Sequence, residues 1–170
     1  MKFNLKNIAF LLFGFLFLAS CGNDYDTADY FDLEELPGYV AFDVDESNNA
    51  ILDTLVVDET AGSASFSIEC PTGTLSDVNI TYDVSGNATA GIDYNIANQG
   101  SITLEVKETD FQNFDRVSLD IEVLEDGVAD GDKTITITLT SASNNEGSLA
   151  VGRGGTDYLK TAVLVITDVD

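Results

Sequence analysis

A two-residue alternation of apolar and polar side chains recurs along the chain after Gly38 and constrains its fold more than any other feature. The even positions are apolar from Val78 to Val84, and the odd positions are apolar from Val117 to Val123. Successive side chains of a β-strand point to opposite faces of its sheet, so this pattern is typical of strands with one buried face. Thr134 to Leu139 alternates in the same way, whereas Ala162 to Ile166 is apolar on both faces and is expected to lie centrally.

Further short strands are expected at Tyr39 to Val44, Ile51 to Val57, Ser63 to Ile68 and Ser101 to Val106. β-Branched residues dominate these segments, and clusters of Gly, Asn and Asp separate them. Strands of this length and spacing, without a helical period, predict an all-β fold. The specific expectation is an antiparallel immunoglobulin-like β-sandwich of about seven to nine strands.

The first twenty residues are typical of a secretory signal. Lys2 and Lys6 precede an apolar run from Ile8 to Leu18, which is too short to span a bilayer comfortably. Leu18-Ala19-Ser20-Cys21 follows and resembles the bacterial lipoprotein signal, in which the Cys is acylated. We therefore expect residues 1–20 to be a lipoprotein signal peptide and Cys21 to carry a lipid anchor. Residues 21–37 are then an acidic tether, and residues 38–170 form the β-sandwich. The expected location is the outer membrane or surface of a Gram-negative bacterium.

The chain is strongly acidic, with 30 Asp and Glu against seven Lys and Arg. All the acids follow Cys21, while Lys2 and Lys6 leave with the signal, so the mature net charge is 5 − 30 = −25. Such a body is repelled by nucleic acid and by anionic lipid, whereas cations and basic partners are consistent with it.

The composition also speaks against catalysis. There is no His, which removes Ser-His-Asp and Cys-His catalysis and the usual transition-metal sites. Cys70 is the other cysteine besides Cys21 and lies in a strand-like run, so we expect a buried small hydrophobe rather than a nucleophile. Paired carboxylates without Trp are a poor match to a glycosidase cleft. We expect that the protein is not an enzyme.

Acidic residues recur where the expected strands end. Glu59 follows one strand, Asp93 lies in a short loop, a stretch runs from Glu125 to Asp132, and the sequence closes on Asp168-Val169-Asp170. Strand ends gather at the poles of an antiparallel sandwich, so these corners can share one pole. Crowded carboxylates repel unless a hard cation lies among them, and Ca²⁺ takes six to eight oxygen ligands.

Four segments together resemble the Calx-beta domain. They are Val57-Asp58-Glu59-Thr60, Thr89-Ala90-Gly91-Ile92-Asp93-Tyr94, Val123 to Lys133 and Ile166 to Asp170, in that family's order and near its spacing. The resemblance covers roughly residues 38–170. It implies a sandwich fold and calcium binding, and bacterial copies of the family occur in surface and adhesion proteins.

The resemblance implies a set of metal ligands, namely Glu59, Asp93, Glu125, Asp126, Asp130, Asp168 and Asp170. The chain departs from the family at several of these positions. Glu125 stands in place of the usual Asp, Asp130 in place of a longer Glu, and Val169 in place of a polar residue. Lys133 puts a cation where another ligand would be. The alternative is that these acids only shape β-turns, because Asp accepts left-handed backbone and caps its own turn.

Two functions follow from these observations. The first is a lipid-anchored, cell-surface, calcium-binding module for adhesion or scaffolding. The second is a metal-free structural accessory of a surface complex that handles nutrients or glycans. Either would have a protein or glycan partner outside the cell.

Overall fold

The computed structural model describes residues 38–43, 53–106 and 115–170. All described residues belong to one compact unit, Leu36–Asp170. The expected signal peptide, the expected lipid anchor at Cys21 and the expected tether lie outside the described residues.

The described part is all-β. Its ten strands are β1 (Tyr39–Phe42), β2 (Thr54–Asp58), β3 (Ser63–Cys70), β4 (Val78–Gly86), β5 (Tyr94–Asn95), β6 (Ser101–Leu104), β7 (Asp115–Val123), β8 (Lys133–Asn144), β9 (Gly147–Val151) and β10 (Thr161–Thr167). Two single 3₁₀ turns, η3 (Glu59–Ala61) and η4 (Arg153–Gly155), interrupt them. Within these ranges no helix has the length and apolar character needed to cross a membrane.

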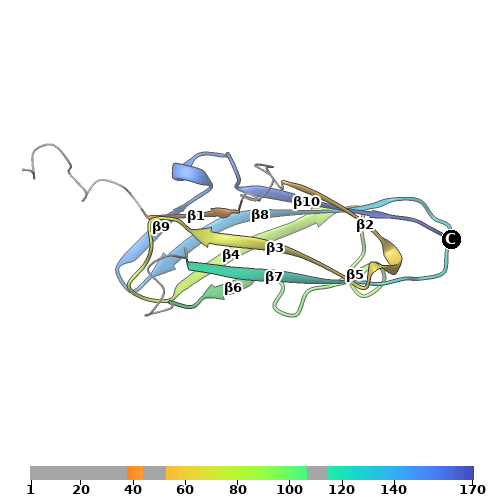
Figure 1. Cartoon of the computed structure of the whole chain (residues 1–170), viewed down its shortest axis with the longest axis horizontal. Coiled ribbons are helices and arrows are strands. Elements are labelled where there is room, and N and C mark those ends of the chain that lie inside the picture. Colours follow the sequence, from red (N-terminus) through yellow and green to blue (C-terminus); the bar gives the residue numbers. More distant parts are fainter. Residues whose placement is uncertain (1–37, 44–52, 107–114) are drawn as a thin grey trace, which may run out of the picture. The chain divides into compact units, whose positions relative to one another are not determined.

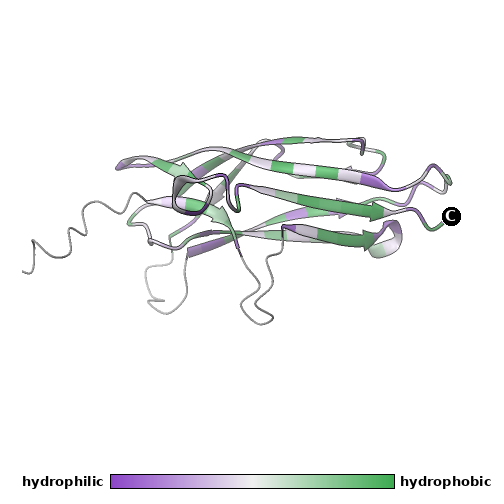
Figure 2. Cartoon of the chain, turned by 90° about the horizontal axis from the view of Figure 1, so that it is seen from above, coloured by the Kyte–Doolittle hydropathy of each residue, from purple (hydrophilic) through white to green (hydrophobic). Residues whose placement is uncertain are grey.

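The strands lie in two layers (Figures 1 and 2). One layer has the order β5-β7-β3-β1, and the other contains β2-β10-β8 with β4 and β6 beyond β8. Strand β9 pairs with β8 and with β1, so the hydrogen-bonded path is continuous from one layer to the other.

Most strand pairs are antiparallel, as expected, but two are parallel and make the sheet mixed. Strand β1 runs parallel to β9, and β2 runs parallel to β10. Both exceptions involve the first stretch of the domain, whose β1 pairs with β3 in one layer and whose β2 pairs with β10 in the other. Strands β1 and β2 therefore run in the same direction, one in each layer.

The core lies between the layers and contains the apolar positions of the alternating segments. Ile80 on β4, Ile121 on β7 and Ile137 on β8 are fully buried, and the polar residues beside them point outward. The rings of Phe42 and Phe66 meet edge to face with centroids 5.8 Å apart. The expected inward faces of these strands are therefore confirmed.

Strand β10 is central, as expected, because it pairs with β2 on one side and β8 on the other. Ala162, Leu164 and Ile166 are buried, while Val163 and Val165 on the outer face are only half-buried. Its doubly apolar sequence therefore reflects a central position rather than burial of both faces.

Cys70 is buried at the end of β3, as expected, and burial is the main cause that raises the pKa of its thiol. Next to it Glu69 is buried beside Arg116, which also contacts Asp43 at 3.1 Å. Burial and the charge of Asp43 raise the pKa of Glu69, although Arg116 opposes that rise. This end of the domain thus contains its own compensated charges.

Candidate metal centre

The parallel pair β2–β10 determines which acidic residues meet. Its register places Thr167 opposite Asp58, so the two strands end side by side. The Thr167 hydroxyl donates to an Asp58 carboxylate oxygen at 2.8 Å and contacts the Val57 carbonyl oxygen at 3.2 Å. Because parallel strands leave the sheet at the same edge, the next residues along each strand, Glu59 and Asp168, become neighbours.

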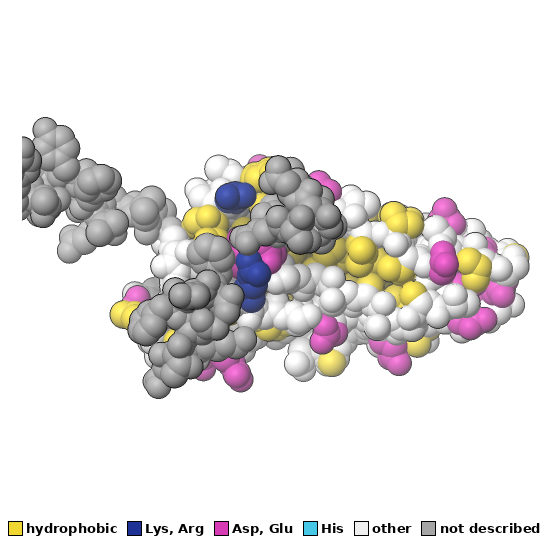
Figure 3. Space-filling view, in the orientation of Figure 1, with side chains coloured by type: hydrophobic (Ala, Val, Ile, Leu, Met, Phe, Trp, Pro, Cys, Tyr) yellow, Lys and Arg dark blue, Asp and Glu magenta, His cyan; other side chains and the backbone are white. Residues whose placement is uncertain are grey.

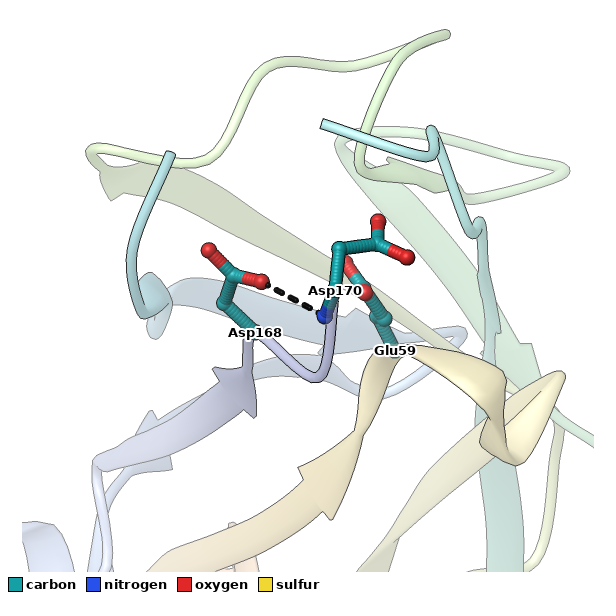
Figure 4. A group of neighbouring side chains, drawn as sticks. All are labelled: Glu59, Asp168 and Asp170. Carbon is teal, nitrogen blue, oxygen red and sulfur yellow. Dashed lines mark hydrogen bonds between the residues drawn. The ribbon is translucent and has the colours of Figure 1, made fainter. Parts of the chain in front are cut away.

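Glu59, Asp168 and Asp170 form the acidic triad of this edge (Figure 4). One carboxylate oxygen from each residue lies within 4.8 Å of the others. Glu59 is only 8% exposed, Asp168 is half-buried and Asp170 is exposed. The tail after β10 is held over Glu59, since the Val169 N–H donates to its Oε1 at 3.2 Å. The Asp170 N–H donates to Asp168 Oδ1 at 3.1 Å.

The triad repels itself. The Val169 N–H lowers the pKa of Glu59, but burial and the charges of Asp170 and Asp168 outweigh it and raise that pKa above its ordinary value. The pKa of Asp168 is lowered, first by the Gly131 N–H and then by the Asp170 N–H, both of which donate to its carboxylate. Asp168 therefore stays ionised. The repulsion among the three carboxylates instead contributes to the raised pKa of the buried Glu59.

Asp93 lies in the loop between β4 and β5, and its side chain organises that loop. It is 7% exposed, and its carboxylate accepts a hydrogen bond from the Thr89 N–H. The Asp93 carbonyl oxygen accepts from the Leu124 N–H at 2.9 Å, which joins this loop to the start of the long turn after β7. Asp93 therefore belongs to the same pole as the triad but lies outside the triad group.

Two acids of the long turn between β7 and β8 have partners close to them in the sequence. The Asp126 carboxylate accepts from the Val128 N–H at 2.9 Å, as in an Asx turn, and Asp130 pairs with Lys133 at 2.6 Å. The hydrogen bond that Lys133 Nζ donates to the Asp130 carboxylate is the main cause that raises the pKa of Lys133, and the charges of Asp130, Asp93 and Asp126 add to it. Lys133 thus serves as the counter-ion of this part of the pole. Glu125 is exposed on the same turn.

Asp132 is a further residue of the site that the ligand set did not include. Its carboxylate accepts the Asp168 N–H at 3.2 Å, so it fixes the start of the tail that carries two triad members. The acidic stretch up to Asp132 was visible in the sequence, but nothing in the spacing separated this supporting residue from the candidate ligands.

The seven expected ligands therefore divide into two sets in the described part of the chain. Glu59, Asp168 and Asp170 form one group with oxygens close enough for a shared ion. The other set is held differently. Asp130 pairs with Lys133, while Asp93 and Asp126 accept backbone N–H groups of their own loops and add to the negative charge that acts on Lys133. Glu125 is exposed to solvent. Hard oxygen donors are the ligands that Ca²⁺ prefers, so the triad fits a small hard cation. In the second set a lysine already neutralises one of the four carboxylates, that of Asp130.

Comparison with solved structures identifies the fold. The chain matches the crystal structure of the apo-form Calx CBD1 domain with a TM-score of 0.55 and 18% identity, over 79% of this chain and 99% of that one. The chain has the fold of the Calx CBD domains.

The Calx CBD2 domain matches with a TM-score of 0.55 and 14% identity, over 78% of this chain and 87% of that one. The calcium binding domain CBD12 of CALX1.1 matches with a TM-score of 0.50 and 21% identity, over 69% and 42%. No family model and no curated protein matches the sequence. The resemblance to Calx-beta domains that the motifs indicated is confirmed at the level of the fold.

Proposed function

We propose that this chain is a calcium-binding β-sandwich module. The observation that carries the proposal is the triad of Glu59, Asp168 and Asp170, with oxygens within 4.8 Å and one carboxylate almost fully buried. Burial and the charges of Asp170 and Asp168 raise the pKa of Glu59, and a divalent cation among the three carboxylates would relieve the repulsion between them. The likeness to Calx domains, among them the calcium binding domain CBD12 of CALX1.1, supports the same assignment.

The donor set favours a single, weak site. Three carboxylates supply between three and six oxygens, against the six to eight that Ca²⁺ takes, so backbone oxygens or water would complete the shell. Lys133 occupies the other half of the pole, which argues against a second ion there. Affinity in the range of about 10⁻⁴–10⁻³ M, common for extracellular modules, is therefore expected.

Equilibrium dialysis of the full chain against radioactive calcium tests the proposal. We expect one calcium per chain, lost in the Glu59→Gln variant. The matched control is Asp83→Asn, which removes a charge from an exposed position in the middle of β4. Calcium retention by Glu59→Gln equal to that of the control would show that the bound ions are only the counter-ion cloud of an acidic protein.

The other parts of the proposal concern the setting of this module. We infer an immunoglobulin-like sandwich. The inference is supported by the first two strands, because β1 pairs in one layer and β2 pairs in the other. We also propose a lipid anchor at Cys21, supported by Leu18-Ala19-Ser20-Cys21, and a place on the outer membrane or cell surface. A calcium-rigidified, anchored and non-catalytic sandwich fits adhesion or scaffolding.

A second function is favoured by one observation. Part of the pole is satisfied by the protein itself, because Asp168 accepts two backbone N–H groups and Lys133 neutralises Asp130. A metal-free structural accessory of a surface complex that handles nutrients or glycans would need no more than this. The dialysis experiment separates the two functions.

A further inference from the structure

Three of the six large hydrophobic side chains that are exposed in the described residues lie on the acidic pole. They are Ile92, Val128 and Val169, which are 53%, 54% and 51% exposed. Each lies one or two residues from a carboxylate of the pole, namely Asp93, Asp126, or Asp168 and Asp170. We call these three residues the aliphatic tips.

The tips belong to one surface because hydrogen bonds join their loops. The Leu124 N–H donates to the Asp93 carbonyl oxygen, which ties the loop of Ile92 to the turn of Val128. The Gly131 N–H donates to the Asp168 carboxylate, which ties that turn to the tail of Val169. Figure 3 shows acidic side chains gathered toward this end of the visible face, with hydrophobic atoms among them.

The loops of the tips project into solvent. Gly91, Gly127 and Gly131 have positive φ angles of 80°, 69° and 86°, and a Cβ atom at any of the three would meet nothing within 4 Å. Ile92 and Val128 are therefore held out by tight turns rather than packed on the sandwich. Each tip is more than half exposed, so its aliphatic surface is accessible to a partner.

The charge around the tips selects the partner. The pole contains eight acids, Glu59, Asp93, Glu125, Asp126, Asp130, Asp132, Asp168 and Asp170, and one base, Lys133, so its formal charge is 1 − 8 = −7. One divalent cation would leave −7 + 2 = −5. With or without calcium the pole repels anionic lipid and acidic proteins and attracts cations.

We propose that the aliphatic tips and the carboxylates around them form a docking surface for a basic polypeptide segment that carries apolar side chains. The apolar groups of the partner pack on Ile92, Val128 and Val169, and its Lys or Arg side chains face the exposed carboxylates. This inference extends the proposed adhesion or scaffolding role to one face and one kind of partner. It does not require that the triad binds calcium.

The test uses the purified full chain and three synthetic peptides of equal length, with alternating Leu and Lys, Gly and Lys, or Leu and Glu. Binding is measured by fluorescence anisotropy in physiological salt, with calcium and with EDTA. We expect the Leu-Lys peptide to bind at least tenfold more tightly than either of the others. A triple variant, Ile92→Ser, Val128→Ser and Val169→Ser, should lose that tenfold preference.

The control variant is Val56→Ser, because Val56 is 60% exposed on β2 within the sheet and should leave binding unchanged. Equal binding of the triple variant and the wild type overturns the proposal, and so does equal binding of the Leu-Glu and Leu-Lys peptides. Binding to phosphatidylserine vesicles without binding to the Leu-Lys peptide would assign the surface to lipid instead. The triple variant keeps every carboxylate, so its calcium dialysis reports separately on the metal site.

Discussion

Calcium should raise the melting temperature of the full chain, and Asp168→Asn should remove most of that rise. Asp168 is the triad member held ionised by two backbone N–H groups, so its carboxylate is already presented for an ion. An amide at this position keeps the size of the side chain but supplies only one neutral oxygen. A ligand that binds only the folded state stabilises it by RT ln(1 + [L]/Kd).

The size of the rise follows from the donor count. With three protein carboxylates and a Kd of about 10⁻⁴–10⁻³ M, about 5 mM calcium adds roughly 1 to 2.3 kcal/mol to the free energy of unfolding. Residues 38–170 form a domain of about 130 residues, whose entropy of unfolding is about 0.27 kcal/mol/K at about 2.1 cal/mol/K per residue. The expected rise is therefore about 4 to 8 °C.

Differential scanning calorimetry in calcium, in magnesium and in sodium chloride of equal ionic strength provides the assay. Magnesium should do less, because it gives up its water reluctantly and needs a tighter octahedron. Asp83→Asn again serves as the control that changes charge without touching the pole. A rise in calcium no greater than the rise in sodium chloride would refute the reasoning, since screening alone would then account for it.

Three further predictions rest on other features. Because the folded state raises the pKa of Glu59, protonation of this residue stabilises the fold fully below about pH 4.5 and that contribution is lost as the pH rises. In EDTA, Glu59→Gln should therefore melt above the wild type at pH 7 and match it near pH 4.5 in a pH series, and no difference at pH 7 would contradict this. Ile121→Ala should lower the free energy of unfolding by about 2–5 kcal/mol in urea, because Ile121 is fully buried. As a control, Val56→Ala at an exposed position should change the free energy of unfolding by no more than about 0.5 kcal/mol. If Ile121→Ala is as nearly neutral as this control, the strand register is refuted. Cys21→Ser should abolish acylation and release the protein from membranes, and an unmodified Cys21 in the intact mass of membrane-extracted protein would count against the anchor.

The core could be predicted residue by residue because alternation is a local property. Ile80, Ile121 and Ile137 are buried where the two-residue period places them, and each needs only its own strand to specify its face. The parallel pairing of β2 with β10 could not be predicted in this way. Val57 and Ile166 are 109 positions apart, and neither segment has a sequence feature that indicates a parallel rather than an antiparallel partner.

The sequence predicts that acidic residues gather at one pole. It does not predict which of them form the triad and which lie near Lys133. Asp168 and Asp130 look alike in sequence, yet backbone N–H groups hold one of them beside Glu59 and a lysine neutralises the other. Lys133 was visible as a departure, and its partner depends on the path of a nine-residue turn from Leu124 to Asp132. Long turns take their shape from contacts with neighbouring loops, which a single sequence does not record.

The parallel β2–β10 pair also determines how the domain would carry mechanical load. The chain enters at Gly38 beside β9, at the end of the sandwich opposite the acidic pole (Figure 1). A pull on Gly38 against a partner held at the pole acts along the strands, so the five paired positions of β2 and β10 are sheared together instead of opening one after another. Forced unfolding is governed by the unfolding rate rather than by equilibrium stability. The same ladder that brings Glu59 to Asp168 would therefore also determine how long the domain stays folded under tension.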